Sequence, residues 1–302
     1  MGGNDPRLNG PGGAPAPATP RRRWRTGPYW LALQVVLSGS LLLLFVLPIL
    51  ALFTYGPFDQ IFLQLQNAQV REALWFTFYA SGISVLAAVL FGIPLGYVLA
   101  RRKFPGRSVL ESLVALPVVV PHLLVGLGLF ILFIPGTLFY RGSEALGFPI
   151  YDSVGGVVLV MVFVSAPYTV LASQLSFRAV DERVIEASRS LGAGPATAFL
   201  TVTFPLALRG IVTGLLLSWA RAVSEIGGLL IIASFVYPGG LYDGPVTTTV
   251  SIFIYDLFQN GNLQGAAAVS SLFLLIAFAL FLSVRVLERS GWLPWRRGEL
   301  GP

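Results

Sequence analysis

The chain of 302 residues contains no cysteine, one histidine and one lysine. Without cysteine it forms neither a disulfide nor a thiolate metal site, and His122 and Lys103 alone offer little for zinc binding or lysine chemistry. No G-x4-G-K-[ST], H-E-x-x-H or G-x-S-x-G motif occurs either. We therefore expect no catalytic residue, no metal and no cofactor in this chain, which excludes most classes of enzyme.

Charge is also scarce, and long apolar runs take its place. Charged residues make up 11% of the chain and hydrophobic residues 55%, whereas about a quarter of the residues in a soluble domain are charged. Apolar runs of 18 or more residues indicate membrane helices. The sequence thus predicts an all-α, polytopic protein with six transmembrane helices, at Tyr29–Thr54, Glu72–Ala100, Val109–Ile134, Ser153–Leu175, Leu208–Phe235 and Leu263–Leu287.

The basic residues predict the orientation of these spans. Of the 20 lysines and arginines, 17 fall in the two tails, the loop between the second and third spans, and the loop between the fourth and fifth. The other side has only Arg71 and Arg141, and Arg221 lies within a span. Since positive loops stay in the cytoplasm, both termini are expected there. The pI of about 9.9 then reflects topology rather than a nucleic-acid partner.

The two ends differ from the middle of the chain. Residues 1–27 are rich in Gly, Pro and Arg and are expected to form a disordered, basic cytoplasmic tail. A signal peptide is the alternative, but the run Tyr29–Phe53 is too long for one and no cleavage site follows it. The transmembrane domain is expected at 28–290, and 291–302 as a second cytoplasmic tail.

Small residues and prolines recur inside the predicted spans. Gly92 and Gly96 form a small-x3-small pattern that lets helices approach closely. Neighbouring helices can satisfy the backbone groups that a proline frees within a span. Either ordinary helix packing or mobile kinks would explain the prolines, which lie at Pro94, Pro117, Pro121 and Pro167.

A polar loop at 176–207 carries the most specific pattern. Asp181 is placed to cap a short helix with a modest apolar face at Val184, Ile185, Ala187 and Leu191, and Gly192 and Gly194-Pro195 are placed to stop it. An ordinary amphipathic cytosolic loop is the simplest interpretation. However, Glu186-Ala187-Ser188-x3-Gly192-x9-Val202-x-Phe204-Pro205 resembles the EAA motif of ABC importer permeases, E-A-A-x3-G-x9-I-x-L-P. Ser188, Val202 and Phe204 depart from that motif, and the spacing is unchanged.

The resemblance implies a type I ABC importer permease, a multi-pass protein of the cell membrane. In that family the loop forms a coupling helix on a separate ATPase dimer, which holds ATP and Mg²⁺. The other implied partners are an extracytoplasmic solute-binding protein, a second permease copy in a homodimer, and the lipid bilayer. The residues carried over as coupling residues are Glu186, Ala187, Ser188, Arg189, Gly192 and Pro205.

A second pattern lies in the fifth predicted span. Arg221 and Glu225 are four residues apart, so on one helix they share a face. Ionised groups within a span usually face the bundle interior or a water-filled cavity. The pair is either a structural ion pair, or Arg221, with Ser224 nearby, lines the path of an anion. The string S-W-A-R-A-V-S-E-I-G-G resembles a segment of molybdate and tungstate permeases, from which Ile226 and Gly228 depart; sulfate permeases are less similar.

A third pattern agrees with the second. Leu116-Pro117-Val118-Val119-Val120-Pro121-His122, followed by Gly126, is similar to the L-P-x-V-x-P-H segment of the same permeases. His122 is placed either to donate to an oxyanion or to bond a neighbouring carbonyl.

Together these patterns favour the membrane subunit of an ATP-driven oxyanion importer, with molybdate or tungstate as the first candidate. Sulfate or another solute is the alternative within that class. Two other classes remain open at this point. An ion-coupled secondary carrier typically shows inverted repeats and several midplane acids, whereas Glu225 is the one clear acid here. An intramembrane enzyme would need paired catalytic groups on facing spans, and only Arg221, Glu225 and His122 are available.

Overall fold

The computed structural model describes residues 28–56, 58–239 and 241–289, which are helical almost throughout. The tails predicted at 1–27 and 291–302 lie outside the described residues. Within the described ranges, β-type pairing is limited to two isolated bridges, Val236 with Thr247 and Gly239 with Tyr242. The helices are α1 (Pro28–Tyr55), α2 (Phe58–Leu63), η2 (Gln64–Gln66), α3 (Ala68–Ala87), the π-helical turn η3 (Ala88–Gly92), α4 (Ile93–Arg101), α5 (Arg107–Val119), α6 (His122–Leu132), α7 (Leu138–Ala145), α8 (Val154–Ala179), α9 (Glu182–Ser190), α10 (Pro195–Ala198), the π-helical turn η4 (Phe199–Thr203), α11 (Phe204–Val223), α12 (Leu229–Ile232), α13 (Val250–Gln259) and α14 (Leu263–Arg289).

Five helical stretches are long and apolar enough to cross a membrane. They are Tyr29–Tyr55, Ala68–Arg101, Val154–Ala179, Pro195–Val223 and Leu263–Val286. The pair α5 and α6 passes the same test together, but the two helices meet at an angle of 113°. The prediction of an all-helical polytopic protein is confirmed, with five spans or, counting the bent pair as one, six.

The third predicted span was wrong as a continuous helix. α5 ends at Val119 and α6 begins at His122, and Val120 between them has an extended backbone (φ −69°, ψ 132°). Pro121 lacks the N–H that a continuing helix needs and disfavours a helical conformation in the residue before it. Pro117 lies inside α5 without ending it, so it is Pro121 that marks the break.

The fifth predicted span was misplaced. The structure has a helix from Pro195 to Val223 instead of one from Leu208 to Phe235. Much of the predicted loop 176–207 is therefore helical, since α8 extends to Ala179 and α10 begins at Pro195. The helix ends at Val223, and the amide of the next residue, Ser224, donates to the carbonyls of Ala220 and Ala222.

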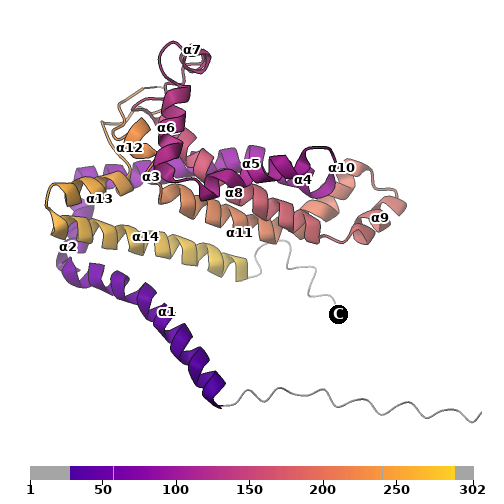
Figure 1. The fold of residues 1–302 in the computed structure, drawn as a ribbon, viewed down its shortest axis with the longest axis horizontal. Helices are drawn as coiled ribbons and strands as arrows, with labels where there is room; N and C mark the ends of the chain where they lie inside the picture. Colours follow the sequence, from indigo (N-terminus) through magenta and orange to yellow (C-terminus); the bar gives the residue numbers. More distant parts are fainter. Residues whose placement is uncertain (1–27, 57, 240, 290–302) are drawn as a thin grey trace, which may run out of the picture. The chain divides into compact units, whose positions relative to one another are not determined.

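The described chain divides at Pro48 into two compact units. The first contains α1 up to Pro48. The second is organised around α8, which packs along α11, α4 and α3 (Figure 1). The packing of α4 on α8 requires glycine, because a Cβ atom at Gly96 would lie 2.7 Å from the Cβ of Ser173. This contact supports close helix packing as the role of the Gly92–Gly96 pattern.

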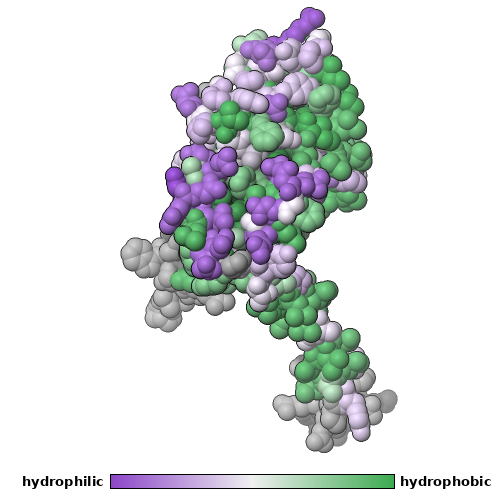
Figure 2. Space-filling model, turned by 90° about the vertical axis from the view of Figure 1, so that its left-hand side faces the viewer, coloured by the Kyte–Doolittle hydropathy of each residue, from purple (hydrophilic) through white to green (hydrophobic). Residues whose placement is uncertain are grey.

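The second unit has polar ends and apolar sides. In Figure 1, α9 and α10 lie at one end of this unit, and α2 and α13 lie at the other. Figure 2 looks onto the latter end, where hydrophilic residues gather, while hydrophobic residues cover the adjoining flank. This distribution suits a body that crosses a bilayer. The exposed polar residues of the segments at this end include Asp59, Gln60, Gln66, Asn67, Gln69, Arg71, Asp256, Gln259, Asn260, Asn262 and Gln264.

Candidate functional site

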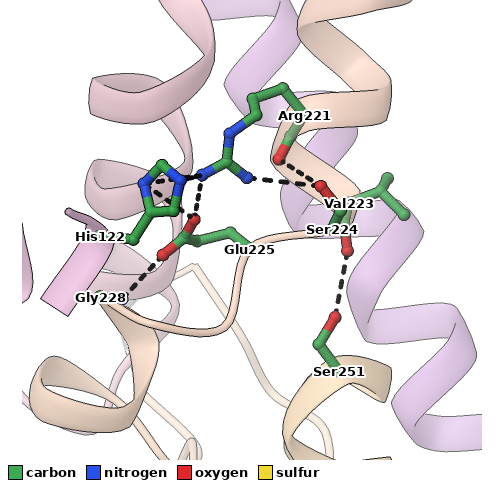
Figure 3. A network of polar contacts seen from close by, with 7 residues as sticks. All are labelled: His122, Arg221, Val223, Ser224, Glu225, Gly228 and Ser251. Carbon is green, nitrogen blue, oxygen red and sulfur yellow. Dashed lines mark hydrogen bonds and ion pairs between the residues drawn. The ribbon is translucent and has the colours of Figure 1, made fainter. Parts of the chain in front are cut away.

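Four residues that the sequence singled out come together in one polar cluster (Figure 3). Arg221 lies in the last turn of α11, Ser224 is the residue that caps this helix, and Glu225 follows it. His122 is the first residue of α6, so the break in the third span brings it to the end of α11. We call these four residues the Arg221 cluster.

The ion pair predicted within the cluster is present. Arg221 Nη2 donates to Glu225 Oε2 over 2.6 Å, and the Glu225 side chain is 1% exposed. The predicted shared helix face is wrong, because Glu225 lies beyond the end of α11. A carboxylate at a helix C-terminus is disfavoured by the helix dipole. Glu225 is compensated by Arg221 and by the Gly228 amide, which donates to Oε1 over 2.7 Å.

Among the described residues, the His122 side chain bonds neither a carbonyl nor any other backbone group. Instead, Arg221 Nη2 lies 2.8 Å from its Nε2 and 2.9 Å from its Nδ1. Since an arginine only donates, the accepting ring nitrogen must carry a lone pair. The His122 Nδ1 also lies 3.9 Å from Glu225 Oε2. The histidine thus supports the guanidinium on the side opposite α11.

The cluster is buried on one side and open on the other. The side chain of His122 is 41% exposed and that of Arg221 is 15% exposed. Ser224 is exposed, and its hydroxyl lies 3.4 Å from Arg221 Nη1. The open side presents the His122 ring and the Ser224 hydroxyl, which donates to the Arg221 carbonyl over 3.2 Å, while the carboxylate of Glu225 is buried. Guanidinium and hydroxyl groups are chemically suited to an anion.

Two glycine contacts that sequence reasoning missed hold α6 against the cluster. A Cβ atom on Gly126 would lie 2.7 Å from the carbonyl oxygen of Gly228, and one on Gly227 would lie 2.8 Å from the Cβ of His122. Only glycine permits this approach of backbone to backbone. Gly126 and the pair Gly227-Gly228 were visible in the sequence, but nothing local indicated that they meet.

The second predicted site is the helix α9 within the EAA loop. The Asp181 side chain accepts from the Arg183 amide over 2.9 Å, as expected of an N-cap. Gly192 adopts a left-handed conformation (φ +94°), and its amide donates to the Arg189 carbonyl over 2.9 Å. These contacts close the end of the helix. The predicted start and stop of this helix are both confirmed.

The side chains of α9 divide into an inner and an outer set. Ile185 packs against a core that includes Phe177 and Ile211, so it does not belong to the outward apolar face that the sequence suggested. The outward set consists of the exposed residues of α9, and exposed Leu191 follows directly as its C-cap; these residues are Glu182, Arg183, Val184, Glu186, Ala187, Arg189 and Ser190. Ser188 is half-buried, and Pro205 lies in the first turn of α11 rather than in a loop. An exposed set of apolar and charged side chains suits contact with a soluble protein.

Comparisons with known proteins show the family of this chain. Residues 92–290 match the family model described as the binding-protein-dependent transport system inner membrane component. The molybdate/tungstate transport system permease protein of Thermococcus kodakarensis is 34% identical over 271 residues, which cover 89% of this chain and 98% of that protein. A probable sulfate transport system permease protein of Helicosporidium sp. subsp. Simulium jonesii is 30% identical over 258 residues, which cover 84% of this chain and 92% of that protein.

A solved structure supports the fold. The crystal structure of a bacterial alginate ABC transporter, in complex with a periplasmic protein bound to an alginate pentasaccharide, contains a chain that superposes with a TM-score of 0.67 at 18% identity. The match covers 86% of this chain and 94% of that one, and at this identity it speaks for the fold alone. The family model and the relatives carry the assignment further: this chain belongs to the family of inner-membrane components of binding-protein-dependent transport systems.

Proposed function

We propose that this chain is the permease subunit of an oxyanion importer and that its anion is molybdate or tungstate. As a member of its family, the chain is a transport subunit of the inner membrane and not itself catalytic. ATP is bound by separate ATPase subunits, and a solute-binding protein is the other partner that the family implies. This membership removes the secondary carrier and the intramembrane enzyme from consideration.

The choice of anion is supported mainly by the likeness to the permease of Thermococcus kodakarensis over 89% of this chain. The donors on the open side of the Arg221 cluster are compatible with it, since guanidinium and hydroxyl groups bind oxyanions well. Sulfate is the second candidate, favoured by the likeness to the Helicosporidium protein. The three anions are all tetrahedral and doubly charged, so the cluster by itself gives no preference.

Transport with purified components tests the anion. The permease is reconstituted in proteoliposomes with its ATPase and binding protein, and uptake of tungstate, molybdate and sulfate is measured in competition. We expect ATP-dependent uptake of tungstate or molybdate that a tenfold excess of sulfate does not suppress, and none without the binding protein. Uptake of sulfate that excess molybdate and tungstate fail to inhibit would overturn the proposed anion.

The proposal includes a homodimer. His122 and Ser224 are open to the surroundings of the chain, so a path lined by them needs a second surface opposite. A second copy related by a two-fold axis is the commonest way to supply one. We propose that two copies enclose the path and that each presents its α9 to one ATPase subunit.

The proposed orientation places α9 in the cytoplasm and the Tyr242–Thr247 segment outside. Ser190→Cys and Asp243→Cys each put one thiol at an exposed position of a chain without cysteine. In intact cells a membrane-impermeant maleimide should label the variant at position 243, and it should label the variant at position 190 only after the membrane is opened. The reverse pattern would contradict the orientation derived from the arginines.

A further inference from the structure

A second polar cluster lies at the first turns of α5, the first half of the broken span, away from the Arg221 cluster. Glu111 of α5 accepts three hydrogen bonds on one oxygen, Oε1. Two come from α8, from Gln174 Nε2 over 2.5 Å and from Arg178 Nη2 over 2.7 Å. The third comes from Arg107 Nε of the same helix over 3.0 Å. One carboxylate oxygen thus joins α5 to α8.

The contacts of Glu111 fix the position of α5 more than they add to folding stability. Gln174 and Arg178 are four residues apart on α8, so they share a face and hold Glu111 between them. Gln174 is 4% exposed, whereas the side chains of Glu111 and Arg178 are 31% and 41% exposed. The ion pair between Glu111 and Arg178 is this exposed and therefore contributes little to folding stability. The two hydrogen bonds from α8 to Glu111 nevertheless set where α5 lies along α8.

The α8 side of this contact leads directly into the EAA helix. Arg178 lies in the last turn of α8, and Val180 caps that helix. The Val180 carbonyl accepts from Arg101 Nη2 of α4 over 2.9 Å. Asp181, the next residue, caps α9. Val180 and Asp181 are both extended, but the hydrogen bond from Arg101 holds this link to α4, so a displacement of α9 is delivered to the end of α8 through a braced connection.

The α5 side leads to the Arg221 cluster. α5 runs without interruption from the turn that holds Glu111 to Val119. The extended Val120 and Pro121 follow, and then His122. A short non-helical break between two packed helices is where a reorientation is readily absorbed. Movement of α5 along α8 would thus change the position of His122 relative to Arg221.

We propose that Glu111 is the positioning residue through which movement of α9 reaches His122. The inference rests on the proposed function in one respect, the docking of the ATPase on α9. Its physical content is that α5 follows the end of α8 because of the Glu111 contacts to Gln174 and Arg178. The pair Glu111–Arg107, within α5, has no part in this transmission because it joins no two helices.

The test follows the position of residue 122 directly and needs no transported anion. His122→Cys supplies the one thiol of the chain, and its labelling by a water-soluble maleimide is measured in complex with the ATPase, with and without a non-hydrolysable ATP analogue. The chain with His122→Cys alone is the reference, and we expect the analogue to change its labelling rate at least threefold. Adding Glu111→Ala or Arg178→Ala should reduce that change below about 1.5-fold, and the double variant should behave like either single one.

Arg107→Ala is the matched control, since it removes a donor from the same oxygen, together with the Arg107 hydrogen bond to the Arg102 carbonyl, but leaves both hydrogen bonds from α8 to Glu111 in place. It should keep the labelling change of the reference. Because the Arg178 side chain is exposed, Arg178→Ala should fold and give a labelling measurement even if Glu111→Ala does not fold. Basal ATPase activity and membrane abundance confirm that each complex is intact. A reference that shows no change, or an Arg178→Ala variant that keeps it, would overturn the inference. Failure of molybdate uptake with the labelling pattern intact would count against the proposed anion only.

Discussion

A Glu186→Arg variant is expected to reach the membrane in normal amount, but its rate of binding-protein-dependent uptake should fall at least about tenfold. Glu186 is exposed on α9, and among the described residues its carboxylate has no hydrogen-bond or ion-pair partner. Its replacement therefore costs little in folding. If α9 docks on the ATPase, reversing this charge places a like or unpaired charge in the contact, which costs several kcal/mol. Uptake and ATPase activity in proteoliposomes measure the effect.

Glu144→Arg is the control for this variant. Glu144 is also exposed, and its replacement by Arg changes the net charge by the same amount, but it lies on α7, remote in sequence from the EAA loop. It should transport at the rate of the unmodified chain. Normal coupling in Glu186→Arg, or an equal loss in both variants, would contradict the assignment of α9 as the docking helix.

The helix α9 could be predicted from the sequence because its signals are local. Asp181 caps a helix through an amide two residues away, and Gly192 ends it by adopting a conformation that other residues rarely accept. The long spans were likewise predictable, since an apolar run of sufficient length has few alternatives. Both kinds of signal depend on neighbours in the sequence, and neither requires knowledge of the fold.

The break in the third span could not be placed in the same way. Pro117 and Pro121 lie in one apolar run, yet the helix continues through the first and stops before the second. The difference depends on packing, because α6 meets the turn at Gly227-Gly228 so closely that Gly126 cannot carry a side chain. An apolar pattern describes the length of a span and not the surfaces that bend it.

The polar clusters show the same limit. The spacing of Arg221 and Glu225 predicted their ion pair, but not that His122 joins them from another helix. Nothing local indicated that Glu111 and Gln174 pair with each other, since they are 63 residues apart. A polar residue within an apolar run was the available hint, and it indicates that a partner exists without naming it.

Arg221→Ala is expected to lower both the amount of folded permease and its uptake. The substitution leaves the carboxylate of Glu225, 1% exposed, with the Gly228 amide as its remaining hydrogen-bond donor. Removing one partner of a buried pair typically costs ~3–5 kcal/mol. Membrane abundance measured by immunoblot and uptake in proteoliposomes should fall together. This variant alone therefore does not separate a structural role of the pair from a role in anion transport.

The double variant Arg221→Met with Glu225→Gln separates these roles. The glutamine keeps an acceptor for the Gly228 amide, which a double alanine variant would leave unpaired in the interior at a cost of ~1–3 kcal/mol. Methionine retains most of the volume of the arginine stem, and no charge remains to be buried. We expect the folded amount to recover while uptake stays at least about tenfold lower, since a guanidinium that lowers the barrier for an anion by 1.4 kcal/mol accounts for that factor. Recovery of full uptake would show that the pair only fixes the end of α11 against α6.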